Sequence, residues 1–362
     1  MGNLETNICG IKMKNPIMPA AGPLVRDVES VRKVVDAGVG AVVTKTISVK
    51  PAKVPNPNMA VDGNLFLNSE LWSEIPWQRW INNIFPSIKE MGVPLIISMG
   101  YTSDDISFLA PKIANLADAV ELSTHYLGDD PKPMLDAIKA AKRYLDIPVW
   151  VKVSPNVRDV GLMARQAMKA GADAIVAINS LGPGLSINID KKLSRLGGQS
   201  GYGWISGYAI KPLAIRYIYE ISKNVDIPVI GVGGISKAED VVEMFMAGAS
   251  AVQICTAAII KGPQIFTKII ERLEKILDKY KYENISDITG LFSDKEESEK
   301  IPNYTFPPNI DLDICNLCER CIKSCVYGAL SIADEEIKLD SNTCAMCGLC
   351  ATRCPVNAIS FD

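Results

Sequence analysis

Eight short apolar runs recur along the first 280 residues, and this repetition constrains the fold more than any other feature of the chain. They occupy residues 16–21, 41–45, 94–99, 117–122, 148–153, 172–178, 228–232 and 251–255. Amphipathic segments separate most of them, such as residues 27–37, 131–145, 157–170 and 238–247. Continuous apolar runs of this kind are typical of parallel strands buried on both faces. Eight strand–helix units in about 280 residues therefore predict an α/β fold, a (β/α)8 TIM barrel.

The alternative for such an alternation is a doubly wound open sheet. In that fold the first strand leads into a glycine-rich turn that binds a dinucleotide. No early G-x-G-x-x-G follows the first apolar run here. The number of units and the missing turn both favour the closed barrel.

Two connections in this pattern are much longer than the others. Residues 46–80 are rich in Pro and Asn and carry three tryptophans that we interpret as packing residues, whereas residues 181–208 hold seven glycines. Both follow the C-terminal end of a strand, where barrel active sites form. We assign residues 1–280 to the barrel. Residues 281–310 are charged and contain prolines, and they are predicted to form a linker packed along the barrel.

Eight of the ten cysteines lie in the last fifty residues, in two copies of the spacing C-x-x-C-x-x-C-x-x-x-C. The first copy is Cys315, Cys318, Cys321 and Cys325, and the second is Cys344, Cys347, Cys350 and Cys354. In ferredoxins with this spacing, the fourth cysteine of each run binds the other [4Fe–4S] cluster. We therefore predict a small α+β ferredoxin domain with two [4Fe–4S] clusters at residues 311–362. Cys354 would complete the first cluster and Cys325 the second.

Zinc and disulfides are the alternatives for these cysteines. Zinc sites commonly use four ligands in two separated pairs, which two identical runs of four do not resemble. Disulfides persist in oxidising compartments, and no secretory signal opens the chain. Pro355 follows the second run, whereas Val326 follows the first where proline is common, a departure that we interpret as tolerated.

The net charge of the chain is small and unevenly distributed. The total is −3, whereas residues 311–362 hold eight acidic and four basic residues, a net −4 that leaves the remainder at +1. Nothing in this balance indicates binding to nucleic acid or to an anionic membrane. No apolar run is long enough to span a bilayer. An acidic ferredoxin module suits docking to a basic redox partner, and we expect a reducing cytoplasm as the compartment.

Glycines and polar residues follow the seventh and eighth predicted strands, in Val232-Gly233-Gly234-Ile235 and in Gln253-Ile254-Cys255-Thr256. Exposed backbone N–H groups at this end of a barrel suit a phosphate. Because the clusters require a redox cofactor to serve, we predict FMN here. A substrate phosphate is the alternative.

Two lysines lie at the ends of buried strands, Lys45 and Lys152. A buried ammonium is costly unless it reaches a partner. Near a flavin, a cation stabilises the reduced form at N1 and O2, whereas the plainer alternative is a lysine paired to a carboxylate. Asn179, which closes the sixth strand, could bind the flavin or the substrate.

His125, the only histidine, and Tyr126 directly follow the fourth predicted strand. A lone histidine is commonly structural, and a tyrosine at this place can be an ordinary rim aromatic. At the C-terminal end of a barrel strand, either side chain is also placed to move a proton. Both are therefore candidate catalytic residues.

The chain resembles the dihydroorotate dehydrogenase-like FMN family over nearly its whole length. It looks closest to the FMN- and ferredoxin-containing half of dihydropyrimidine dehydrogenase. Six motifs carry the resemblance: Thr44-Lys45-Thr46, Phe66-Leu67-Asn68-Ser69-Glu70-Leu71, Val151-Lys152-Val153-Ser154-Pro155-Asn156-Val157, Ile205-Ser206-Gly207-Tyr208-Ala209-Ile210-Lys211-Pro212, Gly233-Gly234-Ile235 and Val252-Gln253-Ile254-Cys255-Thr256. The resemblance implies FMN contacts at Ala21, Lys45, Thr46, Lys152, Gly207, Gly233, Gly234, Ile235, Cys255 and Thr256. It implies substrate contacts at Asn68, Ser123, Asn179 and Ser180.

The departure from the family lies at the acid/base position. After the fourth strand the family reads Glu-Leu-Asn-x-Ser-Cys-Pro, with the cysteine as general acid/base. This chain reads Glu121-Leu122-Ser123-Thr124-His125-Tyr126-Leu127. Ser123 thus replaces the amide that binds the pyrimidine, and Tyr126 takes the place of the cysteine. A phenol differs from a thiol in reach and acidity.

The resemblance implies an FMN- and iron–sulfur-dependent oxidoreductase that acts on a C–C/C=C bond of a small-molecule substrate. Tyr126, or else His125, would handle the proton. No segment for NAD or FAD is found in the chain, so we expect a separate electron partner, either a flavoprotein with FAD and NAD(P) or a ferredoxin. A homodimer or hetero-oligomer is expected. The alternatives are a reductase of another unsaturated carbonyl compound and an electron-transfer subunit whose flavin meets no organic substrate.

Overall fold

The computed structural model describes residues 2–100, 102–123, 128 and 130–361. Its contacts divide the chain into two compact units, one that ends at Asp294 and one that begins at Lys295.

Eight parallel strands form the centre of the first unit, in the spatial order β3-β16-β15-β10-β9-β8-β7-β4. Their bounds are β3 (Ile17–Pro19), β4 (Val42–Val43), β7 (Leu95–Met99), β8 (Ala119–Leu122), β9 (Val149–Val153), β10 (Ala174–Ala177), β15 (Val229–Val232) and β16 (Ala251–Ile254). The backbone N–H of Gly40, just before β4, donates to the carbonyl of Ile17 in β3 over 2.8 Å. The two outer strands of the sheet thereby meet, and the predicted (β/α)8 barrel is confirmed.

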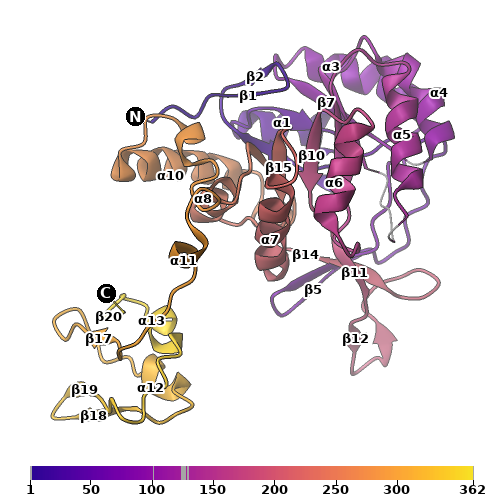
Figure 1. The fold of residues 1–362 in the computed structure, drawn as a ribbon. Helices are drawn as coiled ribbons and strands as arrows, with labels where there is room; N and C mark the ends of the chain where they lie inside the picture. Colours follow the sequence, from indigo (N-terminus) through magenta and orange to yellow (C-terminus); the bar gives the residue numbers. More distant parts are fainter. Residues whose placement is uncertain (1, 101, 124–127, 129, 362) are drawn as a thin grey trace. The chain divides into compact units, whose positions relative to one another are not determined.

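Helices cover the outer face of these strands (Figure 1). They are α1 (Val28–Asp36), α2 (Trp77–Arg79), η2 (Trp80–Ile84), α3 (Phe85–Lys89), α4 (Ser103–Ile113), α5 (Lys132–Lys142), α6 (Val160–Lys169), α7 (Lys211–Ser222), α8 (Ala238–Met246), α9 (Thr256–Lys261) and α10 (Gln264–Tyr280), with short helices η1 (Pro23–Val25), η3 (Tyr208–Ile210) and η4 (Ile285–Ile288). Helix α1 shows how the local sequence forms these helices. Asp27 caps α1 by accepting from the backbone N–H of Ser30, and Val31 and Val34 face the sheet.

Alternate residues of each strand face the barrel interior and the helices. On β8, Ala119 packs among interior residues and Val120 packs under the helices, and Trp150 and Val151 of β9 repeat this alternation. The part of the barrel interior that these residues fill is therefore apolar. A hairpin of β1 (Thr6–Ile8) and β2 (Ile11–Met13) packs buried side chains against the same interior cluster.

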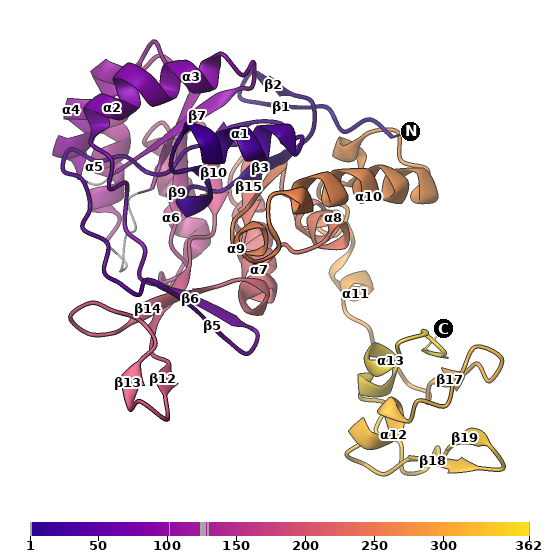
Figure 2. The same cartoon turned by 180° about the vertical axis from the view of Figure 1, so that it is seen from behind.

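The two long connections of the barrel form one structure, which the sequence did not predict. β5 (Met59–Asp62) and β6 (Leu65–Asn68) come from the first connection, and β11 (Leu181–Gly184) and β14 (Gly203–Ser206) come from the second. They pair in the order β11-β14-β6-β5, and β12 (Ile187–Asn188) with β13 (Leu193–Ser194) extends from them as a hairpin (Figure 2). Of the tryptophans in the first connection, Trp80 is fully buried in the core, as expected for a packing residue.

The second unit contains two copies of a loop–helix arrangement. Its elements are α11 (Glu297–Lys300), β17 (Asn309–Ile310), α12 (Arg320–Ser324), β18 (Leu330–Ala333), β19 (Glu336–Leu339), α13 (Leu349–Arg353) and β20 (Ile359–Ser360). β17 pairs with β20 and β18 with β19, both antiparallel. Buried Cys321, Leu330, Ile337 and Ile359 form its small core. This α+β arrangement agrees with the predicted ferredoxin domain.

Among the described residues, no helix has both the length and the apolar character needed to cross a membrane.

Candidate functional site

One large cavity opens at the C-terminal ends of the barrel strands, between the barrel and the sheet made by its two long connections. Its volume is about 970 Å³, at the upper end of the range for small-molecule and cofactor sites. Every described candidate residue for FMN or substrate lines it: Ala21, Lys45, Thr46, Asn68, Ser123, Lys152, Asn179, Ser180, Gly207, Gly233, Gly234, Ile235, Cys255 and Thr256. The remaining two candidates, His125 and Tyr126, lie outside the described residues.

A polar layer underlies this cavity, on top of the apolar barrel interior. Lys152 and Gln253 line the cavity, whereas Glu121 has no exposed surface. The amide Nε2 of Gln253 donates to Oε2 of Glu121 over 2.6 Å. The ammonium of Lys152 lies 3.9 Å from Oε1 of the same carboxylate. Of Lys45 and Lys152, Lys152 is therefore the lysine whose ammonium faces the cavity without a carboxylate in direct contact.

Lys45, by contrast, makes a tight ion pair. Its ammonium lies 2.5 Å from Oε2 of Glu70, and the side chains are 4% and 14% exposed. The amide of Asn58 donates to the other oxygen of Glu70. A carboxylate partner, which was the alternative for these lysines, is thus present at Lys45 and, at the longer distance of 3.9 Å, at Lys152.

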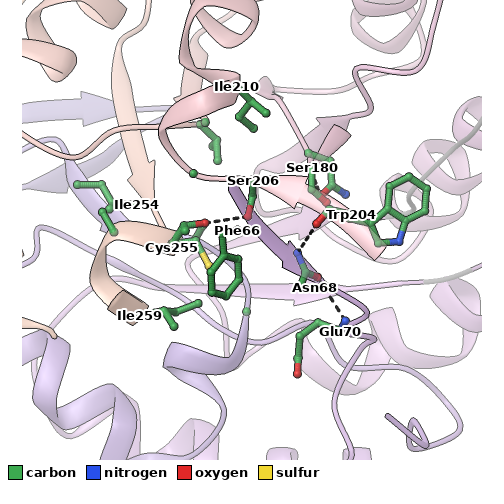
Figure 3. Close-up of a pocket in the computed structure, with 18 of the residues that line it drawn as sticks. Phe66, Asn68, Glu70, Ser180, Trp204, Ser206, Ile210, Ile254, Cys255 and Ile259 are labelled. Atoms are coloured by element: carbon green, nitrogen blue, oxygen red, sulfur yellow. Dashed lines mark hydrogen bonds between the residues drawn. The ribbon is translucent and has the colours of Figure 1, made fainter. Parts of the chain in front are cut away.

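Asn68 connects the two pairing strands at the edge of this site. Its Nδ2 donates to the carbonyl of Trp204 over 3.3 Å, and its Oδ1 accepts from the backbone N–H of Glu70, also over 3.3 Å (Figure 3). The pairing of β6 with β14 therefore brings Asn68 and Glu70 to the cavity. Both connections are needed to build this wall.

The loop after β15 approaches the start of α7 so closely that only glycine fits. Gly234 has φ +77°, and a Cβ there would lie 2.6 Å from Cβ of Lys211 and 2.8 Å from its backbone nitrogen. The result is a stretch of bare backbone along the cavity, which suits the close approach of a phosphate.

A buried ion pair supports this loop. The ammonium of Lys211 donates to Asp240 over 2.8 Å, and Asp240 also accepts from the backbone N–H groups of Ser236 and Lys237. Burial alone would lower the pKa of Lys211, but the hydrogen bonds that its ammonium donates to Asp240 and Glu243 prevail and raise that pKa to about 12. Burial opposes ionisation of Asp240 as well, yet its bonds to Lys211 and Ser236 hold its pKa below the usual range.

Cys255 and Thr256 lie directly after β16, the strand that pairs with β15. The hydroxyls of Thr256 and Ser206 are 2.9 Å apart, and Figure 3 places Ser206 close to Cys255. Burial raises the pKa of the Cys255 thiol, which the nearby ammonium of Lys152 partly opposes. Cys255 lines the cavity as a small side chain.

The residues around the cavity fit FMN. The bare loop at Gly233 and Gly234 suits a phosphate, the ammonium of Lys152 suits an electron-rich ring edge, and the buried Oε1 of Gln253 has no hydrogen-bond partner among the described residues. A buried acceptor of this kind calls for a donor from a ligand. The cavity is also large enough for a substrate beside the flavin.

Sequence reasoning assigned no role to three residues of this site, namely Glu70, Glu121 and Gln253. A usable signal was present for Glu121 and Gln253, because each is a polar residue at an inward position of an otherwise apolar strand. Glu70 offered no such signal, since it lies in an irregular connection.

In the second unit, four predicted cluster ligands surround one small cavity. They are Cys315, Cys318, Cys321 and Cys354, three from the first run and the fourth from the second. Cys354 thus lies beside the three cysteines of the first run, as the predicted exchange of fourth ligands requires for the first cluster. The ten cysteines form no disulfide.

The two cysteine runs also share backbone conformation. Positive φ values of 53° occur at Leu317 and at Met346, each two residues after the first cysteine of its run. The backbone N–H groups of Met346 and Ala358 point to Sγ of Cys344 and Cys354, over 3.4 and 3.2 Å. Amides that point to sulfur stabilise cluster thiolates, so these two contacts suit cysteines that bind a cluster. Val326 is 82% exposed, and no packing requires proline there.

Two protein families match the chain. The family described as "Dihydroorotate dehydrogenase" matches residues 3–277, and the family described as "4Fe-4S dicluster domain" matches residues 309–358. The first match implies FMN in the barrel, and the second implies [4Fe–4S] clusters in the C-terminal unit. Both cofactor types agree with the sites described above.

Several relatives of the chain are named "Dihydroorotate dehydrogenase B (NAD(+)), catalytic subunit". The chain is 34% identical to that of Methanothermobacter thermautotrophicus, over 80% of its own length and 99% of the relative. It is 35% identical to that of Pyrococcus abyssi, over 80% of its length and 98% of the relative. For Thermoplasma acidophilum the identity is 36%, over 80% and 99%. About a fifth of this chain therefore lies outside these alignments.

Proposed function

Because the chain belongs to the dihydroorotate dehydrogenase family of oxidoreductases and carries a [4Fe–4S] ferredoxin domain, we propose that it is a dihydropyrimidine dehydrogenase-like enzyme. It would transfer hydride to or from a C–C/C=C bond of a neutral pyrimidine ring. Two [4Fe–4S] clusters would carry the electrons between the FMN and a partner protein. The oxidoreductase class rests on the family, whereas the substrate is our inference from the cavity.

The observation that carries the substrate proposal is the ion pair of Lys45 and Glu70. Dihydroorotate, after which the relatives are named, bears a carboxylate. In this chain a carboxylate already stands in the cavity wall and holds the ammonium of Lys45 at 2.5 Å. A second carboxylate placed there would meet like charge in a site of low dielectric. A neutral ring with carbonyl and N–H groups would meet no such cost.

The polar side chains of the wall suit such a ring. Asn68, Asn179, Ser123 and Ser180 line the cavity, and their side chains carry both donor and acceptor groups. When bound, FMN supplies a two-electron carrier that accepts or returns a hydride. Lys152 would hold the ring edge of the flavin that gains negative charge on reduction.

The proton of the reaction falls to Tyr126 or His125 in this proposal. These two residues follow Ser123, a residue of the cavity wall, in the sequence. A phenol or an imidazole would exchange the proton at the ring carbon next to the one that exchanges hydride.

For the electron partner we propose a flavoprotein with FAD and NAD(P), or a ferredoxin. The names of the relatives describe each as a catalytic subunit of an NAD(+) enzyme, which supports a hetero-oligomer with an electron-transfer subunit. The C-terminal unit of this chain would be the point where electrons leave or enter.

The test is anaerobic photoreduction of the purified protein followed by reoxidation with uracil, thymine, orotate and a panel of enoates. Fast reoxidation by uracil or thymine, and slow reoxidation by orotate, is the expected result. Preference for orotate would overturn the neutral-ring proposal, and preference for an enoate would replace the pyrimidine. If only a partner flavoprotein reoxidises the flavin, the chain is an electron-transfer subunit.

A further inference from the structure

The buried carboxylate of Glu121 is left without a catalytic role by the proposed function. It comes from the inward face of β8, above Ala119 and beside the register partners Ser98 and Trp150 of the neighbouring strands. Its side chain has no exposed surface. Burying an ionised carboxylate in a barrel interior is expensive unless it is compensated.

The negative charge of Glu121 is only partly compensated, and the groups that compensate it lie on the cavity side. One oxygen accepts from Gln253 over 2.6 Å. The other has no hydrogen-bond partner among the described residues, and the ammonium of Lys152 stands 3.9 Å from it. Both compensating groups, Lys152 and Gln253, line the cavity, whereas Glu121 does not. The carboxylate therefore acts on a cavity ligand through these two neighbours.

Lys45, the other lysine of the site, differs in how its charge is compensated. Lys45 is in direct contact with Glu70, so its charge is largely neutralised at the cavity surface. Lys152 keeps its donors for a ligand, and Glu121 offsets its charge from below at a longer distance. The electrostatic field at the bottom of the cavity therefore depends on the ammonium of Lys152 and on the carboxylate of Glu121 below it.

We propose that Glu121 is a positioning residue that balances the charge of Lys152 and thereby lowers the reduction potential of the bound FMN. Reduction makes the flavin more negative at N1 and O2, and an ammonium nearby favours that form. A carboxylate beneath the ammonium weakens this preference. The reduced cofactor then holds its electrons less tightly, which favours their transfer to the clusters.

The proposal rests on the FMN site of the family and not on the pyrimidine substrate. A redox titration of the holoprotein in the absence of substrate tests it, so its failure and that of the proposed function are distinguishable. The variant is Glu121→Gln, which keeps the shape and removes only the charge. The oxygen of the new amide can take the place of Oε2 and accept from Nε2 of Gln253, so Gln253 keeps its orientation toward the cavity.

In Glu121→Gln the ratio of the affinities for reduced and oxidised FMN should rise at least tenfold, which corresponds to a potential about 30 mV more positive for a two-electron couple. The matched control is Asp118→Asn. It removes one carboxylate charge just before β8, at the opposite end of the strand, where Asp118 accepts from the N–H of Leu95. The control should keep the wild-type potential.

An unchanged potential in Glu121→Gln, or a more negative one, overturns the proposal. If this variant does not fold, Glu121→Gln/Lys152→Gln is compared with Lys152→Gln, because the double variant leaves no unpaired buried charge. The double variant should then have the more positive potential of the two. Equal potentials would contradict the role of Glu121.

Discussion

The ammonium of Lys45 lies 2.5 Å from the carboxylate of Glu70, although the two residues come from different parts of the connection after β4. This pair places a negative charge in the wall of a cavity that is otherwise suited to flavin and substrate. It separates the charge pattern of this site from that of a site built to bind a carboxylate.

Glu70→Gln should free Lys45 to bind a substrate carboxylate. We expect kcat/KM for orotate, relative to that for uracil, to rise about tenfold, equivalent to about 1.4 kcal/mol. Steady-state kinetics with both compounds measure this ratio. Glu74→Gln is the control, because Glu74 is an exposed residue of the same connection that does not line the cavity. An unchanged ratio in Glu70→Gln would remove the argument for a neutral substrate.

Asp240→Asn should destabilise the barrel by about 3–5 kcal/mol at neutral pH, because it leaves the buried ammonium of Lys211 poorly compensated. The pKa of Asp240 is lowered by folding, so its contribution is present above its unfolded pKa of 3.8 and is lost as the pH falls through the lower folded value. The pKa of Lys211 is raised to about 12. The contribution of Lys211 to stability is therefore complete below pH 10.5 and is lost as the pH rises towards about 12.

Denaturant unfolding of the wild type and Asp240→Asn across this pH range measures both effects. The difference between the two proteins should be constant near neutral pH and shrink at both extremes. A difference that stays the same in strong acid would show that the carboxylate charge is not what stabilises the loop.

Gly234→Ala should reduce FMN affinity more than tenfold. The new Cβ would meet the backbone of Lys211 at 2.8 Å, so the loop along the cavity must shift. Gly92→Ala is the matched control, because Gly92 also has a positive φ (+68°) but no atom within 4 Å of the added Cβ. It should lose only about 1–2 kcal/mol to backbone strain and keep its FMN. Flavin content after gel filtration and melting temperature distinguish the two.

Cys354→Ser should disturb the cluster held by the first cysteine run, although Cys354 belongs to the second run. We expect about half of the iron to be lost or made labile, with the flavin content unchanged. Iron analysis and low-temperature EPR of anaerobically purified protein provide the measurement. Cys9→Ser is the control, since Cys9 lies at the other end of the barrel and bonds to the carbonyl of Asp173. Full iron in Cys354→Ser would contradict the exchange of fourth ligands.

Tyr126→Phe should lower kcat by about 10²–10⁴-fold, the usual size of a lost proton transfer, while the flavin content stays constant. His125→Gln should then have a much smaller effect. The reverse order would move the role to His125, and two active variants would assign the proton to water.

The sequence predicted most of the fold because its signals are local. Each of the eight predicted apolar runs contains one barrel strand, as residues 94–99 contain β7 (Leu95–Met99), and the segment at 238–247 contains α8 (Ala238–Met246). Periodicity and capping residues depend on near neighbours only. The candidate residues at strand ends converge because all strands of a parallel barrel end on the same side.

The pairing of the two long connections was not predicted, since β6 and β14 are separated by more than a hundred residues and carry no shared motif. Glu70 enters the site only through that pairing. A sequence contains no local signal for which of its surface loops will meet.

By itself, then, the sequence determined the barrel, the ferredoxin type of the C-terminal domain and the end of the barrel at which the candidate residues lie. Only the tertiary structure decided the charges of that site: Glu70 against Lys45, and Glu121 beneath Lys152. The physical reason is that chain direction and spacing are properties of a segment, whereas a buried charge is balanced by whichever residue barrel closure and strand register bring next to it.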